Sequence, residues 1–434
     1  MVLDDPAAKT IFDTAPLRAQ FPALRVKPTP IFFDNPGGTQ VPMGVIEAVG
    51  AYYARSNANV GGAFATSQRT DHVIADARQA MADLIGAPDP ATIVFGASMT
   101  ALTFHLARSF GETLRPGDEI VVTNLDHDAN VTPWTDLAAQ GAVLRSADIH
   151  PADGTLDLER FQAALTPGRT RLVAITHASN AIGTIPDVAA VTRLAHEAGA
   201  LVFVDAVQYV PHGPVNVAAL DCDFLACSAY KFFGPHVGVL YGKRAHLEHL
   251  TPHKVRPAKD TIPHRWETGT LNHEGIAGVA AAVRYLASVG ELWAAPLVQS
   301  HIARGETPPR AALLAAMPAI KDYEAQLSRR LLAGLAQIED ITVYGLTDPE
   351  RIEDRVPTVA FTWPRLSPRA TCGYLAEKAG ICAWSGNYYA LRLMERLNLQ
   401  ESGGAVRIGC AHYNTSEEID TLLSVLGETP RLGS

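Results

Sequence analysis

Polar side chains of several chemical kinds follow short apolar runs in the middle of the sequence. The runs are β-branched and bounded by turn residues, as buried strands of a parallel sheet are. Ligands of an open α/β sheet bind beyond the carboxyl ends of its strands, so these side chains are candidates for one site. They comprise a carboxylate, an amine, an imidazole, an amide and hydroxyls, namely Asp205, Lys231, His127, Asn180, Ser98 and Ser228.

One cofactor needs this combination of groups. Pyridoxal phosphate requires a lysine for its Schiff base and an acid that keeps its pyridine nitrogen protonated. Lys231 and Asp205 are of these types, and the imidazole of His127 could cover the ring. The phosphate is best held at a helix N-terminus, and residues 96–98 open a predicted helix. The pattern predicts a pyridoxal phosphate site and no metal site.

Each of these residues taken alone has an ordinary structural explanation. A lysine after a strand is usually a solvated loop residue, and Asp205 or Ser98 could simply cap a helix. His127 is one of fifteen histidines. The occurrence of all of them at successive strand ends therefore carries the hypothesis.

The elements that position these residues alternate between strand and helix. Glycines Gly86, Gly141 and Gly199 stand where the predicted helices end. This alternation predicts βαβ units and a mainly parallel sheet with helices on both faces. The predicted strands are 92–95, 119–123, 171–176, 201–205 and 224–228, and the predicted helices are 71–85, 133–140 and 188–198.

The pattern changes after Gly290. Residues 295–312 are mixed and contain two consecutive prolines, which suggests a loop-rich connection. Helices are expected at 319–338 and 416–426, and strands at 341–344, 358–363 and 406–409. We therefore expect a large cofactor domain at 32–292, a connection at 293–311, and a smaller α+β domain formed by 1–31 and 312–434.

Composition narrows the class of protein. The 434 residues are 47% hydrophobic and carry a net charge of −9, which does not favour binding to nucleic acid or to an anionic membrane. No run approaches the roughly 18 apolar residues of a membrane span, and no signal peptide is evident. Five cysteines without a C-x-x-C pair indicate a reducing, cytoplasmic compartment. One of the thiols could still be a nucleophile.

Several segments resemble the signatures of class V aminotransferases, in particular the cysteine desulfurase and selenocysteine lyase group. The region before and around the lysine, 201–208 and 221–235, is the most specific match. Further matches run in order from about residue 31 to 426, at 33–34, 125–134, 176–184, 267–272, 407 and 413–415. The resemblance implies the pyridoxal phosphate transferase fold of type I. Its large domain has a mainly parallel seven-stranded sheet between helices, and its second domain is a smaller α+β unit.

The resemblance also implies a role for each matching residue. Lys231 would form the Schiff base and then shuttle protons, Asp205 would pair with the pyridinium nitrogen, and His127 would stack on the ring. Asn180 and Arg407 would bind the substrate carboxylate. The remaining cofactor contacts would come from Ala97, Ser98, Gln208, Ser228, Tyr230 (often histidine in the family) and Thr270. Thr270 would reach the phosphate of a neighbouring subunit, which implies a homodimer with shared sites.

The chain departs from this group at the desulfurase cysteine. In the corresponding segment, 384–393, Tyr389 occupies the cysteine position, and a phenol cannot accept sulfur as a persulfide. Tyr389 is therefore expected to contact substrate instead, in an entrance made aromatic by Tyr388 and Trp384. Cys382 lies seven residues earlier, in a strand predicted at 380–384, where a buried packing role is the simpler interpretation.

We therefore expect a pyridoxal phosphate enzyme that deprotonates Cα of an amino acid. Elimination of a β-substituent with C–S cleavage is the favoured outcome, which would make the enzyme a lyase. The alternatives are a true cysteine desulfurase using a displaced thiol such as Cys382, and an epimerase or aminotransferase of the same fold. A catalytically silent cofactor-binding scaffold is the alternative from another class of protein.

Overall fold

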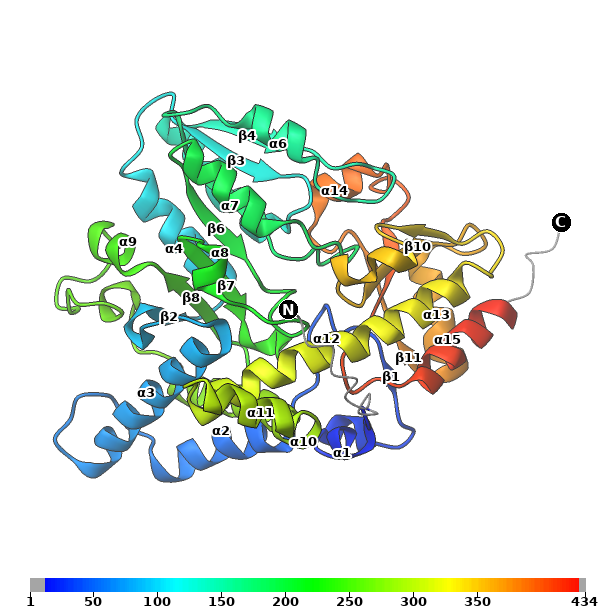
Figure 1. The fold of residues 1–434 in the computed structure, drawn as a ribbon, viewed down its shortest axis with the longest axis horizontal. Helices are drawn as coiled ribbons and strands as arrows, with labels where there is room; N and C mark the ends of the chain where they lie inside the picture. Colours follow the sequence, from blue (N-terminus) through cyan, green and yellow to red (C-terminus); the bar gives the residue numbers. More distant parts are fainter. Residues whose placement is uncertain (1–11, 429–434) are drawn as a thin grey trace.

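The computed structural model describes residues 12–428, and a seven-stranded sheet forms its centre (Figure 1). The strand order is β2-β8-β7-β6-β5-β3-β4, and only β8 runs antiparallel to its neighbours. The strands are β2 Ile93–Gly96, β3 Glu119–Thr123, β4 Val143–Ala147, β5 Thr170–Thr176, β6 Leu201–Asp205, β7 Phe224–Ser228 and β8 Gly238–Gly242. The expected mainly parallel sheet is confirmed; β4 and β8 were not predicted.

Alternate residues of each central strand pack on opposite faces of this sheet. Val121 belongs to one buried cluster, whereas its neighbours Ile120 and Val122 belong to the cluster on the other face. This period of two is the geometry of a pleated strand buried on both sides. The continuous apolar runs in the sequence are explained by this double burial.

Helices cover both faces of the sheet (Figure 1). They are α2 Met43–Arg55, α3 Ala65–Ile85, α4 Met99–Gly111, α5 Thr132–Thr135, α6 Leu158–Ala164, α7 Val188–Glu197, α8 Val217–Leu220, α9 Arg244–His249 and α10 His273–Trp293. Gly86 and Gly141 follow helical segments in the left-handed conformation, as expected. The helix predicted at 133–140 is a short α5 followed by a 3-10 helix, Asp136–Gln140.

The segment after α10 differs from the prediction. Residues 295–312 are not loop-rich, because they contain α11 Ala295–Ala303 and the start of α12 Pro308–Leu335. The two prolines that suggested a loop occupy the first turn of α12, where the missing N–H groups have no helical partner to lose. Pro318 lies inside the same helix.

The C-terminal part forms a second, smaller sheet with helices around it. Its strand order is β12-β13-β10-β9, all antiparallel. The strands are β9 Thr342–Tyr344, β10 Thr358–Thr362, β12 Trp384–Gly386 and β13 Ala405–Gly409. The helices are α13 Pro368–Ala379, α14 Leu391–Arg396 and α15 Ser416–Glu428.

The N-terminal segment contacts both parts of the chain. Leu17 of the short α1 Ala15–Arg18 is buried in the main core, whereas Arg18 pairs with Glu418 of α15 at 2.8 Å. Strand β1 Ile31–Phe32 pairs with β11 Ile381–Cys382. The division into domains stays a prediction, and its residues 1–11 and 429–434 lie outside the described part.

Among the described helices, α10 alone is long and apolar enough to cross a membrane by length and composition. Most of it is buried inside the protein. It packs against α2, α3 and α12, which is the position of a core helix.

Candidate active site

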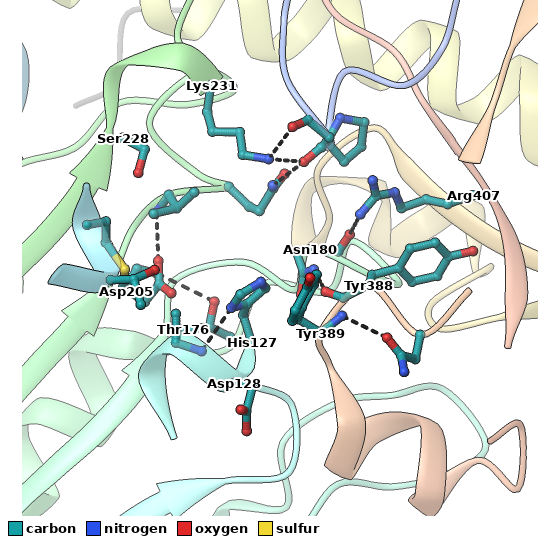
Figure 2. A pocket seen from close by; sticks show the side chains of 18 of the residues that line it. His127, Asp128, Thr176, Asn180, Asp205, Ser228, Lys231, Tyr388, Tyr389 and Arg407 are labelled. Atoms are coloured by element: carbon teal, nitrogen blue, oxygen red, sulfur yellow. Dashed lines mark hydrogen bonds between the residues drawn. The ribbon is translucent and has the colours of Figure 1, made fainter. Parts of the chain in front are cut away.

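A cavity of about 700 Å³ lies where the carboxyl ends of the large sheet meet the small sheet. The ends of β2, β3, β5, β6 and β7 supply one side, and the segment 384–389 with Arg407 of β13 supplies the other (Figure 2). Ligand sites of open α/β sheets occupy this position.

Lys231 enters the cavity from the 3-10 helix Ala229–Lys231, directly after β7. The residue is only 7% exposed. Its Nζ donates to the carbonyl oxygens of Pro36 and Gly37, the latter at 3.0 Å. Burial, together with the nearby Arg407 charge, lowers the pKa of the Lys231 amine to about 7. A substantial fraction of the amine is therefore neutral, and nucleophilic, near neutral pH.

Asp205 ends β6 and faces the same cavity. Its Oδ1 accepts a hydrogen bond from Val207 N at 2.9 Å. Burial raises the pKa of this carboxyl to about 6, and the Lys231 charge opposes the shift. A buried carboxylate of this kind is stabilised by a protonated ring nitrogen placed against it.

His127 forms the wall between these two groups and the small sheet (Figure 2). Its Nδ1 accepts from Ala129 N at 3.0 Å, so the neutral ring carries its proton on Nε2. Burial lowers the pKa of His127 to about 4, with Lys231 contributing in the same direction. The ring is stacked against that of Tyr389, with centroids 5.6 Å apart.

Hydroxyls and a helix N-terminus lie at the end of the cavity near β2. Ser98 caps α4 by accepting from Ala101 N at 3.1 Å, and Ser228 lines the cavity opposite. A Cβ at Gly238 would overlap the backbone of Ser98, so glycine in β8 permits this close approach. The centroid of the Tyr230 ring lies 4.7 Å from Lys231 Nζ and 4.8 Å from the centroid of the stacked His236 ring.

Arg407 lies opposite Lys231 in the cavity (Figure 2). Its Nη2 pairs with Asp34 Oδ1 and its Nη1 donates to Asn180 O, each at 3.0 Å. The guanidinium also stacks on the Tyr388 ring, 4.4 Å from the centroid. Asn180 donates from its Nδ2 to Tyr388 O at 2.8 Å, while its buried Oδ1 has no hydrogen-bond partner within residues 12–428.

The structure brings most of the expected site residues together. Of that set, Ala97 and Thr270 alone are outside the residues that line the cavity, and both are exposed. Gln208 lines it, with Nε2 donating to Pro36 O at 2.9 Å. The matched segment 33–34 includes Asp34, which lines the cavity, but sequence reasoning assigned Asp34 no role in the site.

None of the five cysteines, all within the described residues, lines this cavity. The strand predicted at 380–384 is interrupted at Ala383, and Cys382 ends β11. Cys382 is only partly buried, so the expected buried position is wrong; its strand β11 belongs to a sheet of only two strands among the described residues. Burial raises the pKa values of both Cys382 and Cys410 above that of a free thiol. Neither thiol is activated.

The aminotransferase class-V family model matches residues 31–295 and 312–422. The chain belongs to the class V aminotransferase family. This class V enzyme is 34% identical over 431 residues to the aminotransferase-like protein FGM3 of Gibberella zeae, across 96% of the chain and 98% of that protein. It is also 34% identical over 443 residues to a cysteine desulfurase of Salmonella typhimurium, across 97% of the chain and 99% of that protein.

Solved structures of cysteine desulfurases share the fold of this class V enzyme. The apo enzyme from Thermococcus onnurineus NA1 superimposes with a TM-score of 0.82 at 30% identity, covering 95% of this chain and 97% of that one. The desulfurase CsdA of Escherichia coli superimposes with a TM-score of 0.79 at 29% identity, covering 96% of this chain and 98% of that one. The class V enzyme is thus cysteine desulfurase-like, with the type I fold of a family that depends on pyridoxal phosphate. Residues 296–311, which the family model does not match, hold most of α11.

Proposed function

We propose that the cavity holds pyridoxal phosphate and that the enzyme acts on the Cα of an amino acid. The arrangement that carries the proposal is the cavity shared by Lys231 and Asp205, with His127 on one wall and Arg407 on another. When bound, the cofactor supplies an electron sink for the amino acid. The residues of this chain bind and orient the amino acid and move the proton of its Cα.

The donor set fits each part of that cofactor. Asp205 is a buried acid to which no cationic side chain of the described residues is bonded, as required beside the pyridine nitrogen. Lys231 would supply the amine for the aldehyde, and the flat imidazole of His127 would cover the ring. Gln208 would donate to the phenolic oxygen. The phosphate contacts are assigned to the N-terminus of α4 with Ala97 and Ser98, and to Ser228 and Tyr230.

Residues at the two ends of the cavity act on different parts of the substrate. Arg407 and Asn180 hold the substrate carboxylate, the arginine through paired N–H donors. Lys231 removes the proton from Cα, for which an amine with a pKa near 7 is suited. Tyr389 contacts the substrate side chain. These assignments explain why cations and amides of the two sheets converge on one cavity.

We assign the reaction class as β-elimination with C–S cleavage, which makes the enzyme a lyase. An S-substituted cysteine and water would give a thiol, pyruvate and ammonium, and no acceptor on the protein is needed. The observation that favours this over desulfuration is that no described cysteine lines the cavity. Desulfuration is the second candidate, because full-length relatives are named cysteine desulfurases, and it requires a thiol such as Cys382 to move.

We further propose a cytoplasmic homodimer in which Thr270 serves the neighbouring site. Thr270 is exposed outside its own subunit's cavity. Exposed apolar side chains on α2, Met43, Ile46 and Tyr53, offer surface for a second copy. A molar mass equal to that of a single chain, measured by light scattering, would contradict this assembly.

The reaction class is tested with S-methyl-L-cysteine, L-cysteine and L-alanine as separate substrates. The expected result is pyruvate, ammonium and methanethiol in equal amounts from S-methyl-L-cysteine, and none of these from the Lys231→Ala variant. Alanine formation from L-cysteine without pyruvate would establish desulfuration instead. Racemised or transaminated L-alanine would establish the epimerase or the aminotransferase, and cofactor binding without any turnover the silent scaffold.

A further inference from the structure

The mouth of the cavity is lined by aromatic rings that are open to solvent. Tyr389 is 71% exposed and Trp384 is 58% exposed, and both line the cavity together with Phe104. Large apolar side chains that gather exposed at the rim of a pocket mark a binding surface. The rings are available to the part of a substrate that extends beyond Cβ.

The backbone that presents Tyr389 is strained. Tyr388 and Tyr389 have φ values of 55° and 57°, a left-handed conformation that is unfavourable for bulky residues. Asn180 Nδ2 donates to Tyr388 O at 2.8 Å, and Asp128 N donates to Tyr389 O at 2.7 Å. These bonds from the large domain hold the Tyr389 ring beside His127 (Figure 2). Strain maintained in this way at a cavity points to a functional constraint on the ring's position.

The charges of the lining disfavour an acidic substrate side chain. Among the described residues that line the cavity, Lys231 and Arg407 are the only side-chain cations, since burial keeps His127 neutral. Lys231 is assigned to the cofactor, and Arg407 already pairs with Asp34. Another carboxylate of the lining, Asp128, accepts from Thr132 Oγ1 at 2.7 Å. A second substrate carboxylate would therefore meet negative charge without a spare cation.

We propose that this mouth selects amino acids whose side chain ends in an uncharged aromatic ring, including S-aryl or S-benzyl cysteines. The proposal rests on the proposed function, since Arg407 must hold the α-carboxylate for the side chain to reach Trp384 and Tyr389. The ring of such a substrate stacks on these two side chains, which supply offset-stacked or edge-to-face contacts. The absence of a spare cation rejects glutamate-like substrates.

The test is the affinity of the cofactor-loaded enzyme for L-phenylalanine, L-alanine, L-lysine and L-glutamate, measured by calorimetry. None of the four has a β-leaving group, so elimination does not interfere. We expect phenylalanine to bind about tenfold more tightly than alanine, and glutamate to bind most weakly. Tightest binding of lysine or glutamate, or equal binding of phenylalanine and alanine, would overturn the proposal.

Two pairs of variants separate the rings from the rest of the site. Tyr389→Ala and Trp384→Ala should each bring the ratio of the phenylalanine and alanine affinities close to one, whereas Tyr389→Phe and Trp384→Phe should keep it. A ratio that survives in the double alanine variant contradicts the assignment. These affinities can be measured even if the enzyme does not catalyse the proposed lyase reaction. The selection of an aromatic side chain is therefore tested independently of the reaction class. Absence of binding by all four amino acids contradicts both proposals.

Discussion

The carboxylate of Asp34 lies 3.0 Å from the guanidinium of Arg407, although the two residues are 373 positions apart in the chain. Asp34 follows β1 and Arg407 lies in β13, so the pair joins the N-terminal loop to the small sheet. Asp34 also occupies one side of Arg407, which is the only arginine among the described residues that line the cavity. A substrate carboxylate must share or displace this contact.

Asp34→Asn should therefore strengthen the binding of simple amino acids. Removing the competing carboxylate is worth about 1 kcal/mol for a partly exposed ion pair, which corresponds to roughly fivefold in affinity for L-alanine. Calorimetry on the cofactor-loaded enzyme measures the change. Asp128→Asn is the matched control, because Asp128 lines the same cavity without pairing with Arg407. Weaker binding in Asp34→Asn would mean that Asp34 supports the arginine rather than competing for it.

Lys231 should make the stability of the cofactor-free protein depend on pH. Its folded-state pKa of about 7 lies below the ordinary 10.5. Between these values the unfolded chain binds more protons than the folded one, so the free energy of unfolding rises with pH across this window. Lys231→Met removes the effect. The variant should be about 2–4 kcal/mol more stable than wild type at pH 7, with the difference shrinking toward pH 10.

Urea denaturation of the two proteins at several pH values measures this difference. Both chains carry every other titrating group, so the contributions of groups distant from Lys231 cancel. Asp205 and His127, whose pKa values the Lys231 charge lowers, have wild-type pKa values of about 6 and about 4, below the compared range of pH 7 to 10. Parallel stability curves from pH 7 to 10 would show that burial does not lower the pKa of Lys231.

Asp205→Asn should leave cofactor binding detectable but slow the loss of the Cα proton by at least about a hundredfold. The amide can still accept from Val207 N, so the local fold is kept. It cannot hold a proton on the pyridine nitrogen, which weakens the electron sink. The readout is exchange of the Cα proton of L-alanine with deuterium, followed by NMR. Exchange at the wild-type rate would remove Asp205 from its assigned role.

Cys382→Ala should leave turnover within about twofold of wild type, because the thiol is outside the cavity lining and burial raises its pKa. Release of thiol or sulfide and of pyruvate measures this. A loss of sulfur release from L-cysteine alone, with S-methyl-L-cysteine still cleaved, would identify Cys382 as a sulfur acceptor.

The cofactor side of the site could be predicted from the sequence for a specific reason. Asp205 ends a strand, and Lys231 and His127 each follow a strand within a few residues. Recognising the strands therefore places all three at one edge of the sheet. Burial on both faces makes those strands easy to find as apolar runs. The same reasoning predicted neither β4, whose residues are largely exposed, nor the antiparallel strand β8.

The substrate side depends on long-range contacts that no local pattern encodes. The pairing of Asp34 with Arg407 and the bond from Asn180 to Tyr388 each join segments more than 200 residues apart. The left-handed backbone at Tyr388 and Tyr389 could not be inferred either, because local preference opposes it and tertiary bonds maintain it. Helix α11 was missed because Pro308 and Pro309, which open the next helix, read as a loop.

Reduction of the cofactor-loaded protein with borohydride, followed by peptide mass spectrometry, tests the central claim most directly. A Schiff base between lysine and pyridoxal phosphate becomes a stable secondary amine, which marks the lysine that formed it. The account predicts a phosphopyridoxyl group on the peptide that contains Lys231, and none in Lys231→Ala. A protein that takes up no cofactor, or one modified at other lysines to the same extent in both forms, would contradict it.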